Sequence, residues 1–216
     1  MIKVKKLFLR YTREFYALYD ISLNIDSGES VALIGADESG KTSLLRVLAK
    51  LENKTKGEVF IKDIPIEKLN YKNDINAGYV PATPVFLEQK SVYENFKYIL
   101  RAWNLSEKEI ESKINQTIID YSLEKIKDTK IKDLSLEEKY VLSLIRLTFR
   151  ELELLMIDNI FDILSEPIME VVVDLIKELQ TKKTTLVIAT TSEEVAEKLC
   201  KKKIYFKHGQ IVDKLN

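Results

Sequence analysis

The stretch Gly35–Thr42, GADESGKT, decides how the chain around it folds. It follows a short apolar run, Ser30–Ile34 (SVALI), and leads into a segment with helical spacing of apolar residues, Thr42–Leu51. This is the pattern G-x-x-x-x-G-K-[ST] set between a buried strand and a helix. The chain has only six glycines, and two of them occupy the fixed positions of the pattern. The stretch therefore predicts a strand, a tight loop and a helix start, in that order.

The residue types of this loop suit a phosphate chain. Glycines let backbone N–H groups converge on an anion, and a helix start adds partial positive charge. Lys41 would reach the β- and γ-phosphates, and the Thr42 hydroxyl would bind Mg²⁺. The predicted nucleotide-binding residues of the loop are Gly35, Ala36, Asp37, Glu38, Ser39, Gly40, Lys41, Thr42 and Ser43. Two adjacent acids are unexpected in such a loop, and we expect the side chains of Asp37 and Glu38 to turn away from the anion. A turn without a ligand is the alternative.

The overall composition is that of a globular protein with one core: 216 residues, 45% hydrophobic and 31% charged. There is no run of roughly 18 apolar residues, so no segment is predicted to span a membrane. The 34 basic and 34 acidic residues cancel. Nucleic-acid binders carry a basic excess, so no nucleic acid is expected as a partner. The single cysteine, Cys200, excludes an internal disulfide and fits a reducing compartment.

Strand-like and helix-like segments alternate along the chain, which predicts a parallel α/β sheet. Further strands are expected at Ile2–Leu9, Tyr16–Ile25, Gly57–Ile61, Gly78–Val80, Leu152–Ile157 and Thr184–Thr190, and helices at Ser135–Phe149, Glu166–Leu179 and Glu193–Leu199. Between Ser91 and about Lys127, two apolar stripes have helical spacing and predict an all-helical insert. The stripes are Tyr93, Phe96, Ile99, Leu100 and Trp103, and Ile110, Ile114, Ile118 and Ile119.

A carboxylate at the end of an apolar strand completes the predicted metal site. Leu154–Asp158 reads LLMID, and such an acid can reach the shell of a Mg²⁺ ion bound to the phosphates. We therefore expect Thr42 and Asp158 to be the magnesium ligands from the protein. The alternative is that Asp158 is an ordinary residue at the end of a strand.

Taken in order, these motifs resemble the nucleotide-binding domain of ABC transporters over nearly the whole chain. Further matching segments are Ala77–Pro81 (AGYVP), Ser91–Asn95 (SVYEN), Leu134–Glu138 (LSLEE) and Lys207–Val212 (KHGQIV). The resemblance implies an α/β fold of the ABC-type P-loop NTPase class: a parallel-sheet core, an N-terminal antiparallel β-subdomain and an inserted helical subdomain at about 88–150, within one domain of residues 1–216. It also implies ATP and Mg²⁺ as ligands, with Tyr11 stacking on adenine. A plain strand tyrosine is the alternative for Tyr11.

The resemblance also marks positions where the family's hydrolytic residues are replaced. The loop glutamine, the general base, the D-loop aspartate and the switch histidine fall on Ala82, Asn159, Ser165 and Thr191. An amide cannot accept a proton from water at neutral pH, and a positioned base is worth roughly 10²–10⁴-fold in rate. No hydrolytic residue is therefore intact, although a displaced acid (Asp162, Glu193 or Glu194) could substitute.

The signature segment is altered as well: L-S-G-G-Q has become Leu134, Ser135, Leu136, Glu137 and Glu138. In the family, the two glycines let the backbone approach the γ-phosphate bound on a partner domain. Leu136 would block that approach, and a carboxylate about 4 Å from a phosphate costs on the order of 4 kcal/mol at a dielectric near 20. Ser135 and Glu138 also fit a capping box, which starts a helix with no nucleotide nearby.

Three functions remain open. The first is an ATP-binding subunit of an ABC-type transporter with weak or lost hydrolysis, which acts by nucleotide-dependent association with a membrane-spanning subunit or a competent ATPase. The second is an active transport ATPase with relaxed motifs, and the third is a cytosolic regulatory protein that reuses the fold. The resemblance implies a homo- or heterodimer with another ABC ATPase domain and a cytoplasmic location, peripheral at the inner face of the membrane.

Overall fold

The structure, a computed structural model, describes residues 1–103, 105–181 and 183–214. The chain divides into two compact units, Met1–Ala82 with Glu151–Asn216, and Thr83–Arg150. The predicted helical subdomain, at about 88–150, falls within the second unit. No helix in the described ranges is both long and apolar enough to cross a bilayer.

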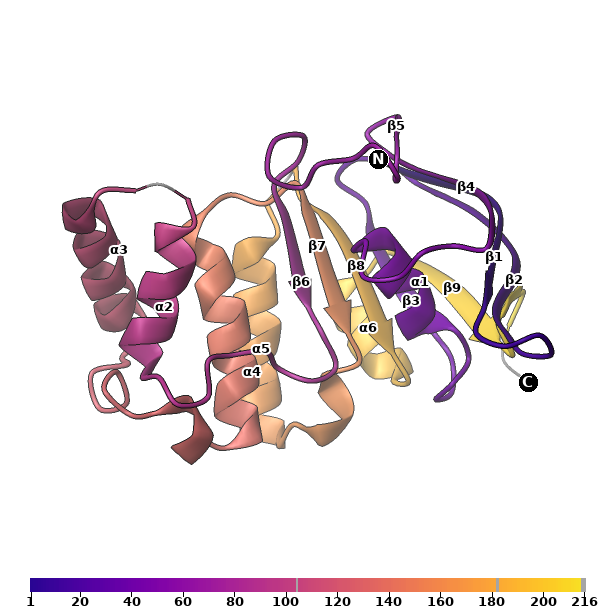
Figure 1. Cartoon of the computed structure of the whole chain (residues 1–216). Coiled ribbons are helices and arrows are strands. Elements are labelled where there is room, and N and C mark those ends of the chain that lie inside the picture. The colour runs from indigo at the N-terminus through magenta and orange to yellow at the C-terminus, as the bar shows by residue number, and fades with distance from the viewer. Residues whose placement is uncertain (104, 182, 215–216) are drawn as a thin grey trace. The chain divides into compact units, whose positions relative to one another are not determined.

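A six-stranded sheet forms the centre of the first unit, with strand order β10-β9-β3-β8-β7-β6 (Figure 1). Its strands are β3 (Ser30–Ile34), β6 (Ala77–Val80), β7 (Leu154–Asp158), β8 (Thr185–Thr190), β9 (Lys202–Lys207) and β10 (Gln210–Val212). All neighbours pair in parallel except β9 and β10. Every residue of β3, β7 and β8 is buried, as strands covered on both faces require. The predicted parallel core is confirmed.

A second, four-stranded sheet in the same unit is antiparallel, with order β2-β1-β4-β5. Its strands are β1 (Ile2–Arg10), β2 (Tyr16–Ile25), β4 (Lys56–Ile61) and β5 (Ile64–Pro65). Ile2, Val4, Leu7 and Leu9 of β1 are buried, whereas the intervening lysines are exposed and Phe8 is half-buried. The predicted N-terminal antiparallel subdomain is therefore present.

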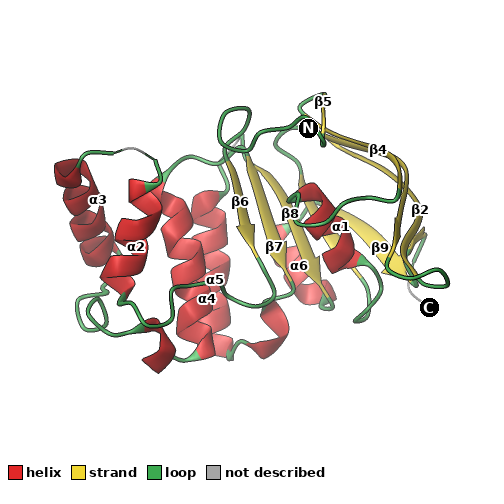
Figure 2. Ribbon diagram, viewed as in Figure 1, coloured by secondary structure: helices red, strands yellow, loops and turns green. Residues whose placement is uncertain are grey.

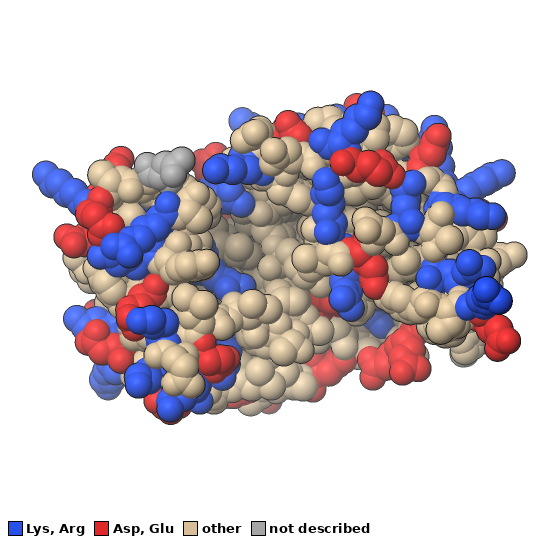
Figure 3. Space-filling model, in the orientation of Figure 1, with Lys and Arg blue, Asp and Glu red and all other residues tan. Residues whose placement is uncertain are grey.

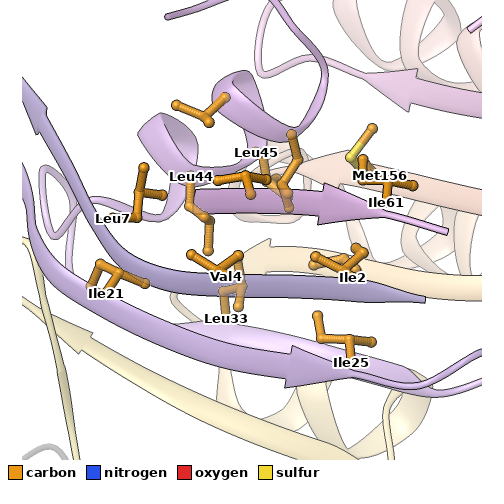
Figure 4. Packing of buried hydrophobic residues seen from close by; sticks show 14 of the residues in the cluster. Ile2, Val4, Leu7, Ile21, Ile25, Leu33, Leu44, Leu45, Ile61 and Met156 are labelled. Atoms are coloured by element: carbon orange, nitrogen blue, oxygen red, sulfur yellow. The ribbon is translucent and has the colours of Figure 1, made fainter. Parts of the chain in front are cut away.

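Helix α1 (Lys41–Leu48) packs between the two sheets. In Figure 4, Leu44 and Leu45 of α1 lie close to Leu7, Ile21 and Leu33, which come from both sheets. Helix α6 (Glu193–Leu199) covers the opposite face of the six-stranded sheet, and α5 (Glu166–Leu179) packs beside α6 (Figure 2). A short 3₁₀ turn, η3 (Phe161–Ile163), follows β7. The apolar face of α1 thus fixes where its N-terminus lies.

The second unit is helical, with α2 (Val92–Arg101), α3 (Glu107–Asp120), η1 (Ile131–Asp133), α4 (Leu136–Ile145) and η2 (Arg146–Phe149). Helices α2 and α3 pack side by side (Figure 1). The core includes Phe96, Leu100, Ile110, Ile114 and Ile118.

Two sequence predictions for this unit were wrong. Ile119 was assigned to the second apolar stripe, but it is 63% exposed. It directly follows the buried Ile118, so it turns about 100° away from that face of α3. The predicted helix Ser135–Phe149 is α-helical only to Ile145 and continues as 3₁₀ turns.

Candidate functional site

The parallel strands bring the predicted site residues to one edge of the six-stranded sheet. Ile34 of β3 aligns with Thr190 of β8, and Asp158 of β7 aligns with Ala189 of the same strand. Val80 of β6 aligns with Ile157. The residues that follow these strands, Gly35, Ala82, Asn159 and Thr191, therefore all leave the sheet at its carboxyl edge, where open α/β sheets bind ligands.

The Lys41 side chain lies inside the loop and is bonded to it. It is buried, and Nζ donates hydrogen bonds to the carbonyl oxygens of Gly35 at 2.7 Å and Ala36 at 2.8 Å, and to Ser39 Oγ at 3.2 Å. Burial lowers the pKa of Lys41, while the nearby carboxylates of Asp37, Asp158 and Asp162 act to raise it. The ammonium group is thus held at the centre of a curled backbone.

The two glycines of the loop are required by close packing. A Cβ at Gly35 would lie 2.3 Å from the carbonyl oxygen of Phe206. Gly40 has φ +108°, and a Cβ there would lie 2.8 Å from the carbonyl oxygen of Ala17. The β9–β10 turn also holds the loop, because Gly209 N donates to the Ser39 carbonyl oxygen at 2.9 Å. The loop shape is therefore fixed by strands on both sides.

The N-terminus of α1 is not capped by a side chain of its N-cap residue. Its N-cap, Gly40, provides no side-chain hydrogen bond, and the first turn contains no acid. The first backbone N–H groups of a helix need partners, and an anion can supply them. The helix start borders a cavity of about 320 Å³, lined by Tyr11, Phe15, Ala17, Asp37, Glu38, Ser39, Gly40, Lys41, Thr42, Ser43 and Asn159. This combination of an open helix start, a buried lysine and a cavity suits a polyphosphate.

The loop acids, Asp37 and Glu38, are solvent-exposed and line the same cavity. Glu38 has a left-handed backbone, with φ +61°. Asp37 lies close enough to the Lys41 ammonium to act on its pKa. That both side chains turn away from a bound anion stays a prediction.

Thr42 and Asp158 meet as the sequence predicted. Thr42 Oγ1 donates to Asp158 Oδ1 at 2.7 Å, and the Tyr79 hydroxyl donates to Asp158 Oδ2 at 3.0 Å. Asp158 is 1% exposed, and its pKa is raised by burial, although these two hydrogen bonds act to lower it. A buried carboxylate with neutral donors is stabilised by a cation.

The donor set fits Mg²⁺ bound together with phosphates. Within the described residues, no three His, Cys, Asp or Glu side chains gather as a metal site. Mg²⁺ commonly takes one or two protein oxygens and completes its shell with water and phosphate oxygens. Asn159 Oδ1, beside Asp158 in the chain, is also buried and has no hydrogen-bond partner among the described residues. Thr42 and Asp158 are therefore the residues that would hold the ion.

Two residues of this site were not found from the sequence. Tyr79 reaches Asp158 because β6 and β7 are parallel neighbours, and no local pattern marks that register. Phe15 was not singled out either. The Tyr11 and Phe15 rings are nearly parallel, at 16°, with centroids 6.3 Å apart. The sequence offers one signal for this pair: an aromatic residue stands at each end of the short turn between the first two strands.

Tyr11 lines the cavity, as the adenine-stacking prediction requires, although stacking itself is untested. Its hydroxyl donates to Glu52 Oε2 at 2.7 Å and lies 3.2 Å from Ser43 Oγ. Burial is the main cause of the raised pKa of Tyr11. The ring is thus anchored at its polar end to two other segments.

The four positions where the resemblance predicts replaced hydrolytic residues differ in their local structure. Asn159 adopts a left-handed backbone, with φ +47°, and its N–H donates to the Ala189 carbonyl oxygen at 3.0 Å. Ala82 is exposed just beyond β6, and Ser165 is exposed at the N-cap of α5. Thr191 Oγ1 donates to Asp162 Oδ1 at 2.8 Å.

The three displaced acids differ in their surroundings. Glu193 pairs with Lys203 at 2.8 Å, and Glu194 pairs with Lys198 at 2.7 Å. Asp162 instead bonds to Thr191, and its charge acts against the lowering of the Lys41 pKa by burial. Asp162 is thus the displaced acid whose charge acts on the loop lysine.

The signature segment, in the second unit, starts α4 with a complete capping box. Ser135 N donates to Glu138 Oε2 at 2.7 Å, and Glu138 N donates to Ser135 Oγ at 3.2 Å. Leu134 is buried, whereas Leu136 is 49% exposed. Glu137 and Glu138 supply two acids in the first turn. The helix start is therefore capped and charge-compensated by its own side chains.

Acidic and basic side chains are interspersed on the face drawn in Figure 3. At the site, a glycine loop joins a buried parallel strand to a helix, around a lysine and beside a Thr–Asp pair. Together these features define an α/β protein of the P-loop nucleotide-binding class.

Comparison with known proteins narrows the class. The family described as ABC transporter matches residues 18–162, and the chain belongs to that family. Its fold is also that of solved ABC cassettes. A dimeric bacterial ABC transporter cassette, MJ0796, has a TM-score of 0.85 at 26% identity and covers 98% of this chain and 96% of its own. The cbiO1 protein of Clostridium perfringens, part of a transporter complex, has a TM-score of 0.80 at 23% identity, covering 98% and 86%.

Curated relatives include ATP-binding proteins of two import systems. The spermidine/putrescine import ATP-binding protein PotA of Legionella pneumophila (strain Paris) is 26% identical over 98% of this chain and 58% of its own length. The methionine import ATP-binding protein MetN of Clostridioides difficile (strain 630) is 25% identical over 99% and 68%. The chain thus spans a little over half of the first relative.

Proposed function

We propose that the chain is an ATP-binding subunit of an ABC-type transporter that binds Mg-ATP with weak or lost hydrolysis. It acts by nucleotide-dependent association with a membrane subunit or with a competent ATPase domain. The observation that carries the proposal is a contrast at one sheet edge. Thr42 is hydrogen-bonded to Asp158, whose charge acts on the Lys41 ammonium held inside the loop, whereas the neighbouring residue in the base position is the amide Asn159.

Nucleotide binding rests on the loop. In the free chain, the Lys41 ammonium bonds to the carbonyl oxygens of Gly35 and Ala36. A γ-phosphate would offer this ammonium a charged partner and would accept hydrogen bonds from the open start of α1. Bound Mg²⁺ would neutralise phosphate charge, while Thr42 and Asp158 would hold it against the β- and γ-phosphates.

Weak hydrolysis is supported by the groups around this loop. The Asn159 amide cannot take a proton from an attacking water at neutral pH. Thr191, in the switch position, uses its hydroxyl to bond Asp162. Ala82 has no polar side-chain atom with which to orient water. The site is thus complete for holding a nucleotide but has no base in the expected place.

A membrane partner is supported by the surface of the second unit. Val85, Leu87 and Tyr98 are 65%, 42% and 63% exposed. A cavity of about 410 Å³ is lined by Leu87, Lys90, Tyr93, Glu94, Lys97, Tyr98 and Arg101. Exposed apolar side chains rimmed by charges are typical of protein–protein contacts. This segment overlaps the family's docking region for a membrane subunit, around Thr83–Tyr93.

The relatives favour an import system, because both PotA and MetN are named import ATP-binding proteins. They serve different substrates at nearly equal identity to this chain, so no substrate is proposed. Association with a membrane subunit would place the chain on the cytoplasmic side, peripheral to the bilayer. Dimerisation with a second ABC ATPase domain belongs to the same proposal.

One observation favours a second candidate, an active transport ATPase with relaxed motifs. The Asp162 carboxylate is held by Thr191 at 2.8 Å and acts electrostatically on Lys41. In this alternative, Asp162 takes the proton of the attacking water in place of the residue at position 159.

Calorimetry and a phosphate-release assay on the same preparation test the proposal. We expect micromolar Mg-ATP binding, loss of binding in Lys41→Ala and little phosphate release. Lys72→Ala, which removes an exposed amine away from the loop, is the matched control. Absence of binding at millimolar ATP would refute the proposal. Robust turnover that disappears in both Lys41→Ala and Asp162→Asn would establish the second candidate instead.

A further inference from the structure

The turn between β1 and β2 brings a second aromatic ring to the nucleotide cavity. Tyr11 N donates to the Phe15 carbonyl oxygen at 3.1 Å, which closes the turn between them. The two rings are nearly parallel, at 16°, with centroids 6.3 Å apart. Both rings line the cavity of about 320 Å³ that borders the phosphate loop.

The two rings are supported differently. Tyr11 is held at its hydroxyl by Glu52 and Ser43. Phe15 is 52% exposed, so part of its ring is open to a ligand. A planar base that covers this ring would remove apolar surface from water and stack on its face.

We infer that Phe15 is a second base-contacting ring, which together with Tyr11 favours purine over pyrimidine nucleotides. Separate contacts on both faces of an inserted base would need ring centroids about 7 Å or more apart. At 6.3 Å, the base therefore lies against the pair from the cavity side. The inference rests on the proposed binding of nucleotide at this loop.

A consequence for selectivity follows from this arrangement. Rings recognise the face of a base and not its hydrogen-bonding edge, so a stacked site tolerates different bases. A purine offers more surface to two rings than a pyrimidine does. ATP and GTP should therefore bind with similar affinity, and both should bind more tightly than CTP.

The test uses Phe15→Ala and Phe15→Leu, with Tyr19→Ala as the matched control. Tyr19 is an exposed aromatic residue of β2 that packs on Phe8 and Tyr16 and is not among the residues that line the cavity. Binding of Mg-ATP, Mg-CTP and Mg-tripolyphosphate to the whole chain is measured by calorimetry. Tripolyphosphate has no base and therefore reports on the phosphate loop alone.

Both Phe15 variants should lose roughly 5- to 100-fold in Mg-ATP affinity, the range measured for stacking of one base on one ring. Their tripolyphosphate affinity should equal that of the wild type, and their preference for ATP over CTP should shrink. Wild-type ATP affinity in Phe15→Ala, or an equal loss for tripolyphosphate, would overturn the inference. A wild-type chain that binds neither ATP nor tripolyphosphate would instead refute the proposed function itself.

Discussion

Two helices of this protein start in opposite ways. Helix α1 starts at Gly40, with no side-chain cap and no acid in its first turn. Helix α4 starts at Ser135 with a closed capping box and with Glu137 and Glu138 in its first turn. Both starts fall on motifs that contact nucleotide in the family. The first start has no capping side chain and no acid, whereas the second is capped by a serine and has two acids in its first turn.

In the proposed function, this difference separates nucleotide binding from nucleotide hydrolysis. Of the residues that would hold phosphate and metal, Lys41 is bonded to the loop carbonyl oxygens, and Thr42 is bonded to Asp158. The residues that would act on the γ-phosphate are replaced at Asn159 and Thr191, and the helix start at Ser135 is satisfied without a ligand. The following experiments attempt to remove that separation, from the largest expected effect to the smallest.

Asn159→Glu should produce the largest change. A carboxylate at this position restores a base beside the predicted metal, and a positioned base is worth roughly 10²–10⁴-fold in rate. Phosphate release at saturating Mg-ATP is the measurement, and Asn159→Gln, which has the same length but no charge, is the control. An equal increase in both variants, or none in either, would show that the missing base is not what limits hydrolysis.

The pH dependence of binding tests the open start of α1 through Lys41. Burial lowers the pKa of Lys41 in the free chain, whereas bound phosphate favours its charged form. ATP affinity should therefore fall as pH rises, by up to about tenfold per unit, starting below the ordinary lysine pKa of about 10.4. The last phosphate proton leaves near pH 6, so ATP itself adds little in this range (a group pKa of about 6). Constant affinity by calorimetry through about pH 10.5 would contradict the role given to Lys41.

Ser135→Ala tests the closed start of α4. Loss of an N-cap hydroxyl costs about 1 kcal/mol of stability, measurable as a lower urea midpoint. Mg-ATP affinity of the isolated chain should not change, because the capping box needs no nucleotide. A change in affinity without a change in stability would mean that this helix start does meet the ligand.

Glu38→Gly should have the smallest effect. Glu38 has φ +61°, a conformation that costs a residue with a side chain about 1–2 kcal/mol. Glycine avoids this cost, but it loses more conformational entropy on folding, which offsets part of the gain. A net gain of about 0.5 kcal/mol is expected in thermal unfolding, with ATP affinity retained. Asp37→Ala, which removes the neighbouring acid from a position without that strain, is the control. Lower stability of Glu38→Gly would show that the acid makes a contact worth more than its strain.

Sequence patterns were sufficient where the chemistry is local. The loop is eight consecutive residues, and Asp158 directly ends a buried strand, so the order of strand, loop and helix and the place of Asp158 were predicted from short segments. The capping box at Ser135 depends on residues three apart and was found for the same reason. The parallel core followed from the alternation of strands and helices.

Contacts set by strand register or turn geometry were not predictable in this way. Tyr79 reaches Asp158 only through the pairing of β6 with β7. The bond between Thr191 and Asp162 joins two loops that follow neighbouring strands, 29 positions apart in the chain. Phe15 faces the cavity because the turn that contains it closes on Tyr11. Each of these depends on which segments become neighbours, and no local spacing records that.

A single-turnover experiment tests the central claim most directly. The protein is held in excess over radiolabelled Mg-ATP, and the nucleotide that remains bound after filtration is identified by chromatography. The separation of holding from hydrolysis predicts that the retained nucleotide is intact ATP after many minutes. Retained ADP within seconds to a minute would contradict it and would show that this site hydrolyses what it binds.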